Sequence, residues 1–270
     1  MRNMKRIALL VLIVVFTSAC ATMNGGTGSN LDRIAESGVL RVGTAANMPP
    51  LNMLDKSDLP MGLDVDLASY IAGAMGVELS LVIKPFAQLL PALEAGEVDM
   101  VISGLTITPE RNMKVAFAGP YHISGKALLT KFESLVTSEN TDKLNSEAFA
   151  YTALEASTSA DLVKTLMPKA RLVTASNYDE AVEMVLSNKV DALVADYHVC
   201  VLSLLQHPGE GLVSLITPFT YEPLGIALPA GDAQMINWMD NFLNTMRESD
   251  ELMKMKVKWI EDPSWLRNLK

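Results

Sequence analysis

The sequence has 270 residues, 49% of them apolar and 20% charged, which is enough apolar material for one large or two medium globular domains. Its 22 basic and 31 acidic side chains give a net charge of −9. No dense basic cluster is present, and the overall field would repel phosphate backbones, so nucleic-acid binding is excluded. Of the two cysteines, Cys200 lies in an apolar stretch and is expected to be a buried small hydrophobe.

The N-terminus has the layout of a secretory signal. Arg2, Lys5 and Arg6 precede an unbroken apolar run over residues 7–16, and small residues follow this run. The run is too short to cross a bilayer as a helix, which takes about 20 residues. No later apolar run is long enough either. We therefore expect residues 1–19 to be a signal peptide and the remainder to be soluble and exported.

Residues 17–20, Thr-Ser-Ala-Cys, resemble the lipobox of bacterial lipoproteins, in which small residues precede the cysteine that receives lipid. Thr17 departs from the leucine that is usual at this place. Residues 20–30 are rich in small and polar side chains and are expected to form a flexible tether. The alternative is ordinary cleavage after Ala21. The first interpretation predicts a lipid anchor on Cys20 at the periplasmic or cell-surface face of a bacterial membrane.

Strands and helices are predicted to alternate along most of the chain. Strands are predicted over residues 39–43, 77–83, 98–103, 149–154, 172–175 and 190–195. Helices are predicted over residues 63–75, 87–95 and 178–186, from residue 160, and in the tail over 232–259. Strands that are continuously apolar and alternate with helices indicate an α/β fold with mainly parallel sheets covered on both faces.

An internal echo relates two of these units. Residues 93–103 resemble residues 185–195, since each contains a helix end, a Gly or Asn, and a strand that opens Val-Asp. The alignment places Gly104 beside Asp196, both just where a predicted strand ends. Open α/β sheets bind ligands outside the carboxyl ends of their strands, so two similar lobes would share one cleft. The alternative is that any two helix–turn–strand units look alike.

Polar residues that could bind a small zwitterion follow these strand ends. Arg111 offers a bidentate fork for a carboxylate, with Gly104 and Thr106 beside it. Residues 157–159, Ser-Thr-Ser, open a predicted helix whose N-terminus attracts anions, and Asp196 would hold an ammonium. Each of these residues has a plainer alternative. Arg111 would be a solvated residue in the helix that begins at Thr108-Pro109-Glu110. The serines and Asp196 would be helix N-caps that need no ligand.

The segment 103–111, Ser-Gly-Leu-Thr-Ile-Thr-Pro-Glu-Arg, closely resembles the polar amino-acid family of extracellular solute-binding proteins. Residues 62–68, Gly-Leu-Asp-Val-Asp-Leu-Ala, are similar to the first-helix signature of that family. Matching segments follow in order as far as residue 259. The resemblance implies a type II periplasmic-binding-protein clamshell that serves an ATP-driven importer.

The resemblance also implies domain bounds. Lobe 1 would comprise residues 31–122 and 222–270, and lobe 2 residues 126–218. The hinge would lie at about residues 121–125 and 219–222, where the chain crosses between the lobes. Closure around a ligand would be a hinge motion.

Site roles carried over from the family concern both ends of an amino acid. Arg111 would hold the carboxylate and Asp196 the ammonium, and Phe86 would pack on the ligand side chain unless it is only a core aromatic. The full set of predicted ligand-binding residues is Met48, Phe86, Ser103, Gly104, Thr106, Arg111, Glu155, Thr158, Ser159 and Asp196.

Two departures from the family bear on ligand choice. Ala45 stands where relatives often have an acid, which favours a ligand with a neutral side chain, although Glu155 could supply charge. Met48 replaces an aromatic residue and gives a softer wall.

Three other functions are considered. A cyclohexadienyl-dehydratase-like enzyme on the same scaffold would need a general acid, for which Glu155 and Glu222 are the candidates. A metal carrier is disfavoured because the three histidines are scattered. A ligand sensor for a membrane signalling partner stays open. We expect a monomeric, non-enzymatic protein without cofactor or metal, whose partners are an amino acid, the permease subunits and, through the lipid, a membrane.

Overall fold

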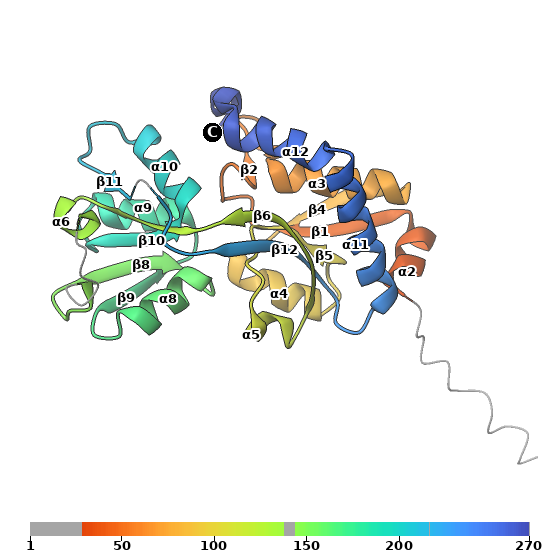
Figure 1. The fold of residues 1–270 in the computed structure, drawn as a ribbon, viewed down its shortest axis with the longest axis horizontal. Helices are drawn as coiled ribbons and strands as arrows, with labels where there is room; N and C mark the ends of the chain where they lie inside the picture. The colour runs from red at the N-terminus through yellow and green to blue at the C-terminus, as the bar shows by residue number, and fades with distance from the viewer. Residues whose placement is uncertain (1–28, 138–143, 216, 270) are drawn as a thin grey trace, which may run out of the picture.

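The computed structural model describes residues 29–137, 144–215 and 217–269. The predicted signal peptide, the lipobox and Cys20 lie outside these residues. Within the described part of the chain, no helix has both the length and the apolar character needed to cross a membrane. The described chain forms two lobes, each built on one five-stranded sheet (Figure 1).

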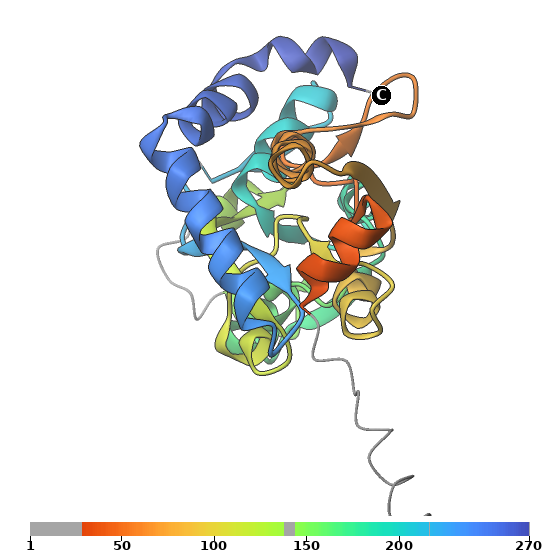
Figure 2. The ribbon, with the colours of Figure 1, turned by 90° about the vertical axis from the view of Figure 1, so that its right-hand side faces the viewer.

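The first lobe contains the sheet of strand order β4-β1-β5-β12-β6. Its strands are β1 (Val39–Thr44), β4 (Glu78–Ile83), β5 (Met100–Val101), β6 (Ala116–Ser124) and β12 (Glu222–Leu228). Its helices are α2 (Asn30–Ser37), α3 (Leu63–Met75), α4 (Phe86–Glu94), α5 (Pro109–Asn112), α11 (Ala233–Glu248) and α12 (Glu251–Lys256). Both views show α11 and α12 running along the outside of this lobe (Figure 2).

The second lobe contains the sheet of strand order β11-β7-β10-β8-β9. Its strands are β7 (Lys126–Thr130), β8 (Ala150–Leu154), β9 (Arg171–Ala175), β10 (Ala192–Asp196) and β11 (Val213–Ser214). Its helices are α6 (Glu133–Val136), α8 (Thr158–Leu166), α9 (Tyr178–Leu186) and α10 (Tyr197–Gln206). Every residue of β7, β8 and β10 is buried, as expected for strands covered by helices on both faces.

The two sheets share one plan. Strands β4, β1 and β5 pair in parallel, and so do β10, β8 and β9. Strands β12 and β6 join the first sheet, and β7 and β11 the second, through antiparallel pairs. The fold is therefore the predicted α/β clamshell, but "mainly parallel" describes only three strands of each sheet.

The internal echo corresponds to a repeated structural role. A carboxylate oxygen of Asp99 accepts a hydrogen bond of 2.8 Å from the backbone N–H of Arg41 in β1. Asp191 accepts one of 2.7 Å from the N–H of Ala150 in β8. Each Val-Asp pair thus ties the start of one parallel strand to its neighbour. The predicted strand over 98–103 is shorter than expected, because the chain turns after Val101.

The lobes are joined where β6 leads into β7 and where the chain returns to β12. A Cβ on Gly125, between β6 and β7, would lie 2.5 Å from the Thr220 carbonyl oxygen and 2.5 Å from the Cβ of Pro218. The Lys126 N–H donates to the Thr220 hydroxyl at 2.9 Å. Glycine therefore allows the two crossing segments to touch. A hinge motion at these crossings stays a prediction.

Candidate ligand-binding site

The loop after β5 is fixed by a buried carboxylate. Asp64 is 1% exposed and accepts hydrogen bonds from the Gly104 N–H (2.9 Å), the Asn52 amide (2.7 Å) and the Tyr121 hydroxyl (2.7 Å). Burial raises its pKa to about 6, although these hydrogen bonds oppose the shift. The Gly-Leu-Asp motif of α3 therefore shapes the loop that carries part of the site.

Gly104 is required by this loop for two reasons. Its φ of +60° lies in the left-handed region, which side chains other than glycine rarely adopt. A Cβ at this position would also stand 2.4 Å from the sulfur of Met48. Glycine thus lets the loop pass directly under Met48.

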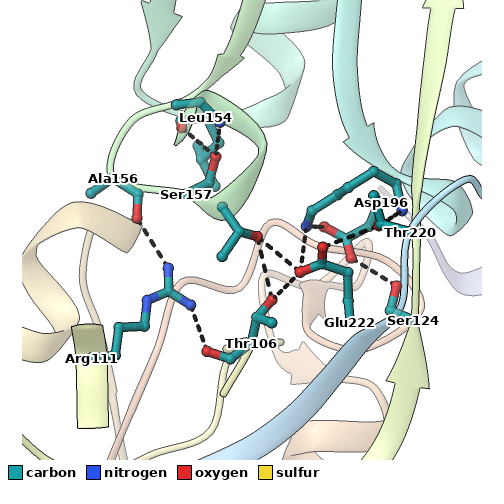
Figure 3. Close-up of polar contacts among 12 residues, drawn as sticks. Thr106, Arg111, Ser124, Leu154, Ala156, Ser157, Asp196, Thr220 and Glu222 are labelled. Atoms are coloured by element: carbon teal, nitrogen blue, oxygen red, sulfur yellow. Dashed lines mark hydrogen bonds and ion pairs between the residues drawn. The ribbon is translucent and has the colours of Figure 1, made fainter. Parts of the chain in front are cut away.

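Arg111 reaches from the first lobe to the second. Thr108 caps α5 by accepting from the Arg111 N–H at 3.2 Å, as predicted. The guanidinium donates to the carbonyl oxygens of Thr106 (2.9 Å) and Ala156 (3.1 Å) (Figure 3). It also lies 5.8 Å from the centre of the Phe86 ring. Among the residues described, no acidic side chain forms an ion pair with it. The alternative of a merely solvated side chain is therefore wrong.

The N-terminus of α8 faces Arg111 from the second lobe. Ser157 is the N-cap of this helix and accepts from the Ala160 N–H at 3.2 Å, so the N-cap interpretation is correct for this serine. The hydroxyls of Thr158 and Thr106 lie 3.4 Å apart across the cleft. Ser159 is fully buried behind them, and its hydroxyl has no partner among the described residues.

Asp196 ends β10 at the floor of the cleft. Asp196 is the N-cap residue of α10, as the alternative predicts, but its side chain makes no capping bond to that helix. Instead, one oxygen accepts from the Ser124 hydroxyl at 2.7 Å and the other from the ammonium of Lys126 at 2.8 Å. Asp196 is 2% exposed. A buried carboxylate thus already holds a cation at the predicted ammonium site.

Glu222 is the second carboxylate of the cleft. Its oxygens accept hydrogen bonds from the hydroxyls of Thr106 (2.8 Å), Thr158 (3.1 Å) and Thr220 (3.1 Å) (Figure 3). The Lys126 ammonium lies 3.7 Å from it. Because Thr158 belongs to the second lobe and Thr106 to the first, Glu222 helps to hold the lobes together.

The cleft brings together most of the predicted residues. Its lining residues are Met48, Phe86, Gly104, Thr106, Arg111, Lys126, Ser157, Thr158, Tyr178 and Asp196. Three predicted residues do not line it. Ser103 is buried and accepts from the Ala45 N–H at 2.9 Å, Ser159 lies behind the surface, and Glu155 is exposed.

Lys126 and Tyr178 line the cavity and Glu222 bonds to two of its threonines, but none of the three is in the predicted set of ligand-binding residues. The sequence signal for Lys126 was a lysine that directly precedes the apolar run 127–129 of a strand. Glu222 was considered in the sequence only as a candidate general acid, and Tyr178 carried no such signal.

The cavity among these residues is nearly closed. Its volume is about 10 Å³, which is room for about one water molecule. A larger groove of about 840 Å³ also lies between the lobes, but it is lined by acids such as Asp179, Glu180 and Glu183 and by no arginine. That groove therefore offers a carboxylate no guanidinium. An amino acid would enter the Arg111 site only when the lobes part.

The sequence pattern of the bacterial extracellular solute-binding proteins, family 3, matches residues 40–262. The chain belongs to this family. It is 28% identical to a probable histidine-binding protein of Neisseria gonorrhoeae over 95% of this chain and 96% of that protein. It is 25% identical to the cyclohexadienyl dehydratase of Pseudomonas aeruginosa over 86% of this chain and 87% of the enzyme.

A solved structure shows the same fold. A putative ABC-transporter binding component of Wolinella succinogenes, complexed with lysine, superposes with a TM-score of 0.78 at 35% identity and covers 85% of this chain and 99% of its own. The predicted amino-acid-binding family and the clamshell fold are thus confirmed. The family contains binding proteins and at least one enzyme, so the scaffold alone does not separate the two activities.

Proposed function

We propose that the protein captures an amino acid with a neutral side chain between its lobes and delivers it to an ABC-type permease. One observation carries this proposal. Arg111, whose guanidinium has only backbone carbonyls and a ring as described partners, faces a buried carboxylate, Asp196, across one cleft. An α-carboxylate would replace the carbonyls on Arg111 with a charge-assisted bidentate contact, while Asp196 would attract the α-ammonium.

The neutral side chain follows from the charges of the cleft. Arg111 and Lys126 are balanced by Asp196 and Glu222, so no acid is left over for a cationic side chain. Glu155, the other acid considered, is exposed and does not line the cavity. Met48 and Phe86 supply apolar walls instead.

Delivery, anchoring and oligomeric state extend the proposal. Similarity to relatives such as an ABC-transporter glutamine-binding protein of Bacillus subtilis supports delivery to a permease. Lipid on Cys20 would hold the protein beside that permease, and a monomer would leave both lobes free to dock. A sensor would use the same cleft, so uptake of the bound amino acid by cells is the observation that separates the two roles.

The arrangement of Glu222 favours binding over dehydratase chemistry. This glutamate is the only described acid of the two candidates that lies at the cleft, and it accepts hydrogen bonds from three hydroxyls. These protein hydroxyls engage both oxygens of Glu222, whereas a general acid must direct an oxygen at the ligand. Incubation with prephenate or arogenate is expected to give no product above that of an Arg111→Ala variant.

A thermal-shift screen of the twenty amino acids, followed by calorimetry, tests the proposed function. A ligand at 100 times its Kd adds about 2.7 kcal/mol of stability, which is a clear shift. We expect the largest shifts from amino acids with neutral side chains. Lysine or arginine bound far tighter than all of these would refute the neutral side chain. No shift with any amino acid would refute the proposal as a whole.

A further inference from the structure

Lys126 forms an ion pair with Asp196, the residue that we expect to receive an α-ammonium. It is the first residue of β7 and the cross-strand partner of Asp196 in β10. Its side chain is 3% exposed, and its ammonium lies 2.8 Å from an Asp196 oxygen. The other Asp196 oxygen accepts from Ser124 at 2.7 Å. Both oxygens of the expected ammonium receptor are therefore already in use.

An amino acid would bring a second ammonium to this carboxylate. Two cations would then share Asp196 in a cavity that excludes water, and their repulsion is strong where the dielectric constant is low. Lys126 can avoid this only by moving toward Glu222, which is 3.7 Å away. Glu222 already accepts from Thr106, Thr158 and Thr220, so its capacity for a further donor is reduced. The move would also break a buried ion pair, which is costly.

A carboxylic acid with oxygen on carbon 2 fits the same site without this conflict. Its carboxylate needs only Arg111, as in the proposed function. Its 2-oxygen needs a hydrogen-bond donor where an amino acid carries its ammonium. Lys126 supplies one, because an ammonium has three hydrogens: one is given to Asp196 and a second faces Glu222. The Lys126–Asp196 pair then stays intact while the ligand is bound.

We propose that Lys126 stands in for the ligand's ammonium and thereby opens the cleft to a second ligand class, the 2-oxo and 2-hydroxy acids. These acids bind more tightly than the amino acids that carry the same side chain. The proposal rests on the proposed function for the Arg111 carboxylate contact and for the neutral side chain. It departs from that function only in the group on carbon 2.

Matched ligand pairs test the proposal by calorimetry on the exported chain. The pairs are alanine with pyruvate, leucine with 4-methyl-2-oxopentanoate, and phenylalanine with phenylpyruvate, together with the corresponding 2-hydroxy acids. We identify the pair whose side chain gives the highest affinity. For that pair, we expect the wild type to bind the 2-oxo or 2-hydroxy acid at least tenfold more tightly than the amino acid. Tighter binding of the amino acid in every pair overturns the proposal and leaves the proposed function standing. No binding in either series overturns both.

Variants of Lys126 identify the residue responsible. Lys126→Gln frees Asp196 and removes the cation, so the amino acid should gain at least tenfold in affinity and the 2-oxo acid should lose at least tenfold. Lys131→Gln is the matched control, because Lys131 lies just beyond the far end of β7 and donates to the Leu186 carbonyl, away from the cleft. It should change both affinities less than twofold.

Folding of these variants is checked by their melting temperatures. If Lys126→Gln does not fold, Lys126→Arg takes its place: it keeps the cation and should retain the preference for the 2-oxo acid. The comparison of ligand pairs in the wild type tests the proposal in either case. An unchanged ligand preference in a folded Lys126→Gln variant would overturn the role given to this side chain.

Discussion

Replacement of Arg111 by alanine is the most direct test of the carboxylate site. The side chain makes two hydrogen bonds, to the carbonyls of Thr106 and Ala156, and one ring contact with Phe86. Both carbonyls face the cleft and can be hydrated when the lobes part, so their loss should cost little stability. We expect the free energy of unfolding to fall by about 1 kcal/mol, in the range of a single hydrogen bond.

The expected effect on binding is much larger. The closed cavity has room for about one water molecule, so a ligand carboxylate in it would be stripped of solvent. Truncation of one side of a desolvated charge pair costs about 2–5 kcal/mol, which is roughly 30-fold to several-thousand-fold in affinity. Arg111→Lys should recover only part of this, because an ammonium does not reproduce the planar fork.

Calorimetry with the best ligand from the screen measures these differences. Arg171→Ala is the matched control, since Arg171 is exposed at the start of β9 and its side chain donates to the Lys189 carbonyl, at 3.4 Å. It should bind as the wild type does. An Arg111→Ala variant within threefold of wild-type affinity would refute the carboxylate site, and the arginine would then be a tie between the lobes.

Three further predictions concern stability and processing. Because burial raises the pKa of Asp64 to about 6 from an unfolded value of 3.8, its contribution to stability is full below pH 4 and falls by about 3 kcal/mol as the pH rises through 6. Asp64→Asn should remove this pH dependence and destabilise the fold, and urea unfolding from pH 4 to 7 measures both effects. If the free energy of unfolding varied with pH equally in the two proteins, the prediction would be contradicted. The pKa of His122 is lowered from 6.5 to about 4, mainly by burial and then by the neighbouring His198. Its contribution to stability is therefore full above pH 6.5 and is lost as the pH falls through 4. His122→Gln should flatten the pH dependence of stability in that window, and an unchanged midpoint of acid unfolding would count against this. Mass spectrometry of membrane-extracted protein should find lipid on Cys20 as the first residue, and an unmodified chain that begins after Ala21 would show ordinary cleavage instead.

Much of the fold could be predicted because its signals are local. The helix over 178–186 has the predicted bounds, since Asn177 caps its start and the apolar spacing runs unbroken to its end. The strand over 98–103 was predicted too long, because hydropathy alone does not show that Asp64 pulls the chain into a turn at Gly104. Local sequence patterns thus located the helix and the strand, whereas the end of the strand depends on Asp64, a residue distant in the sequence.

The candidate site divides along the same line. Arg111 and Asp196 could be predicted because Asp196 ends a strand and Arg111 lies in the segment after one, and α/β sheets place their ligands at strand ends. Lys126 could not be predicted, because its place in the cleft depends on the ion pair with Asp196, 70 residues away in the sequence. The β7–β10 register sets Lys126 opposite Asp196, and a slip of one residue would turn the lysine to the other face of the sheet. The residue that discriminates most sharply between ligands is therefore defined by strand pairing, and a motif that matches a whole family does not reveal it.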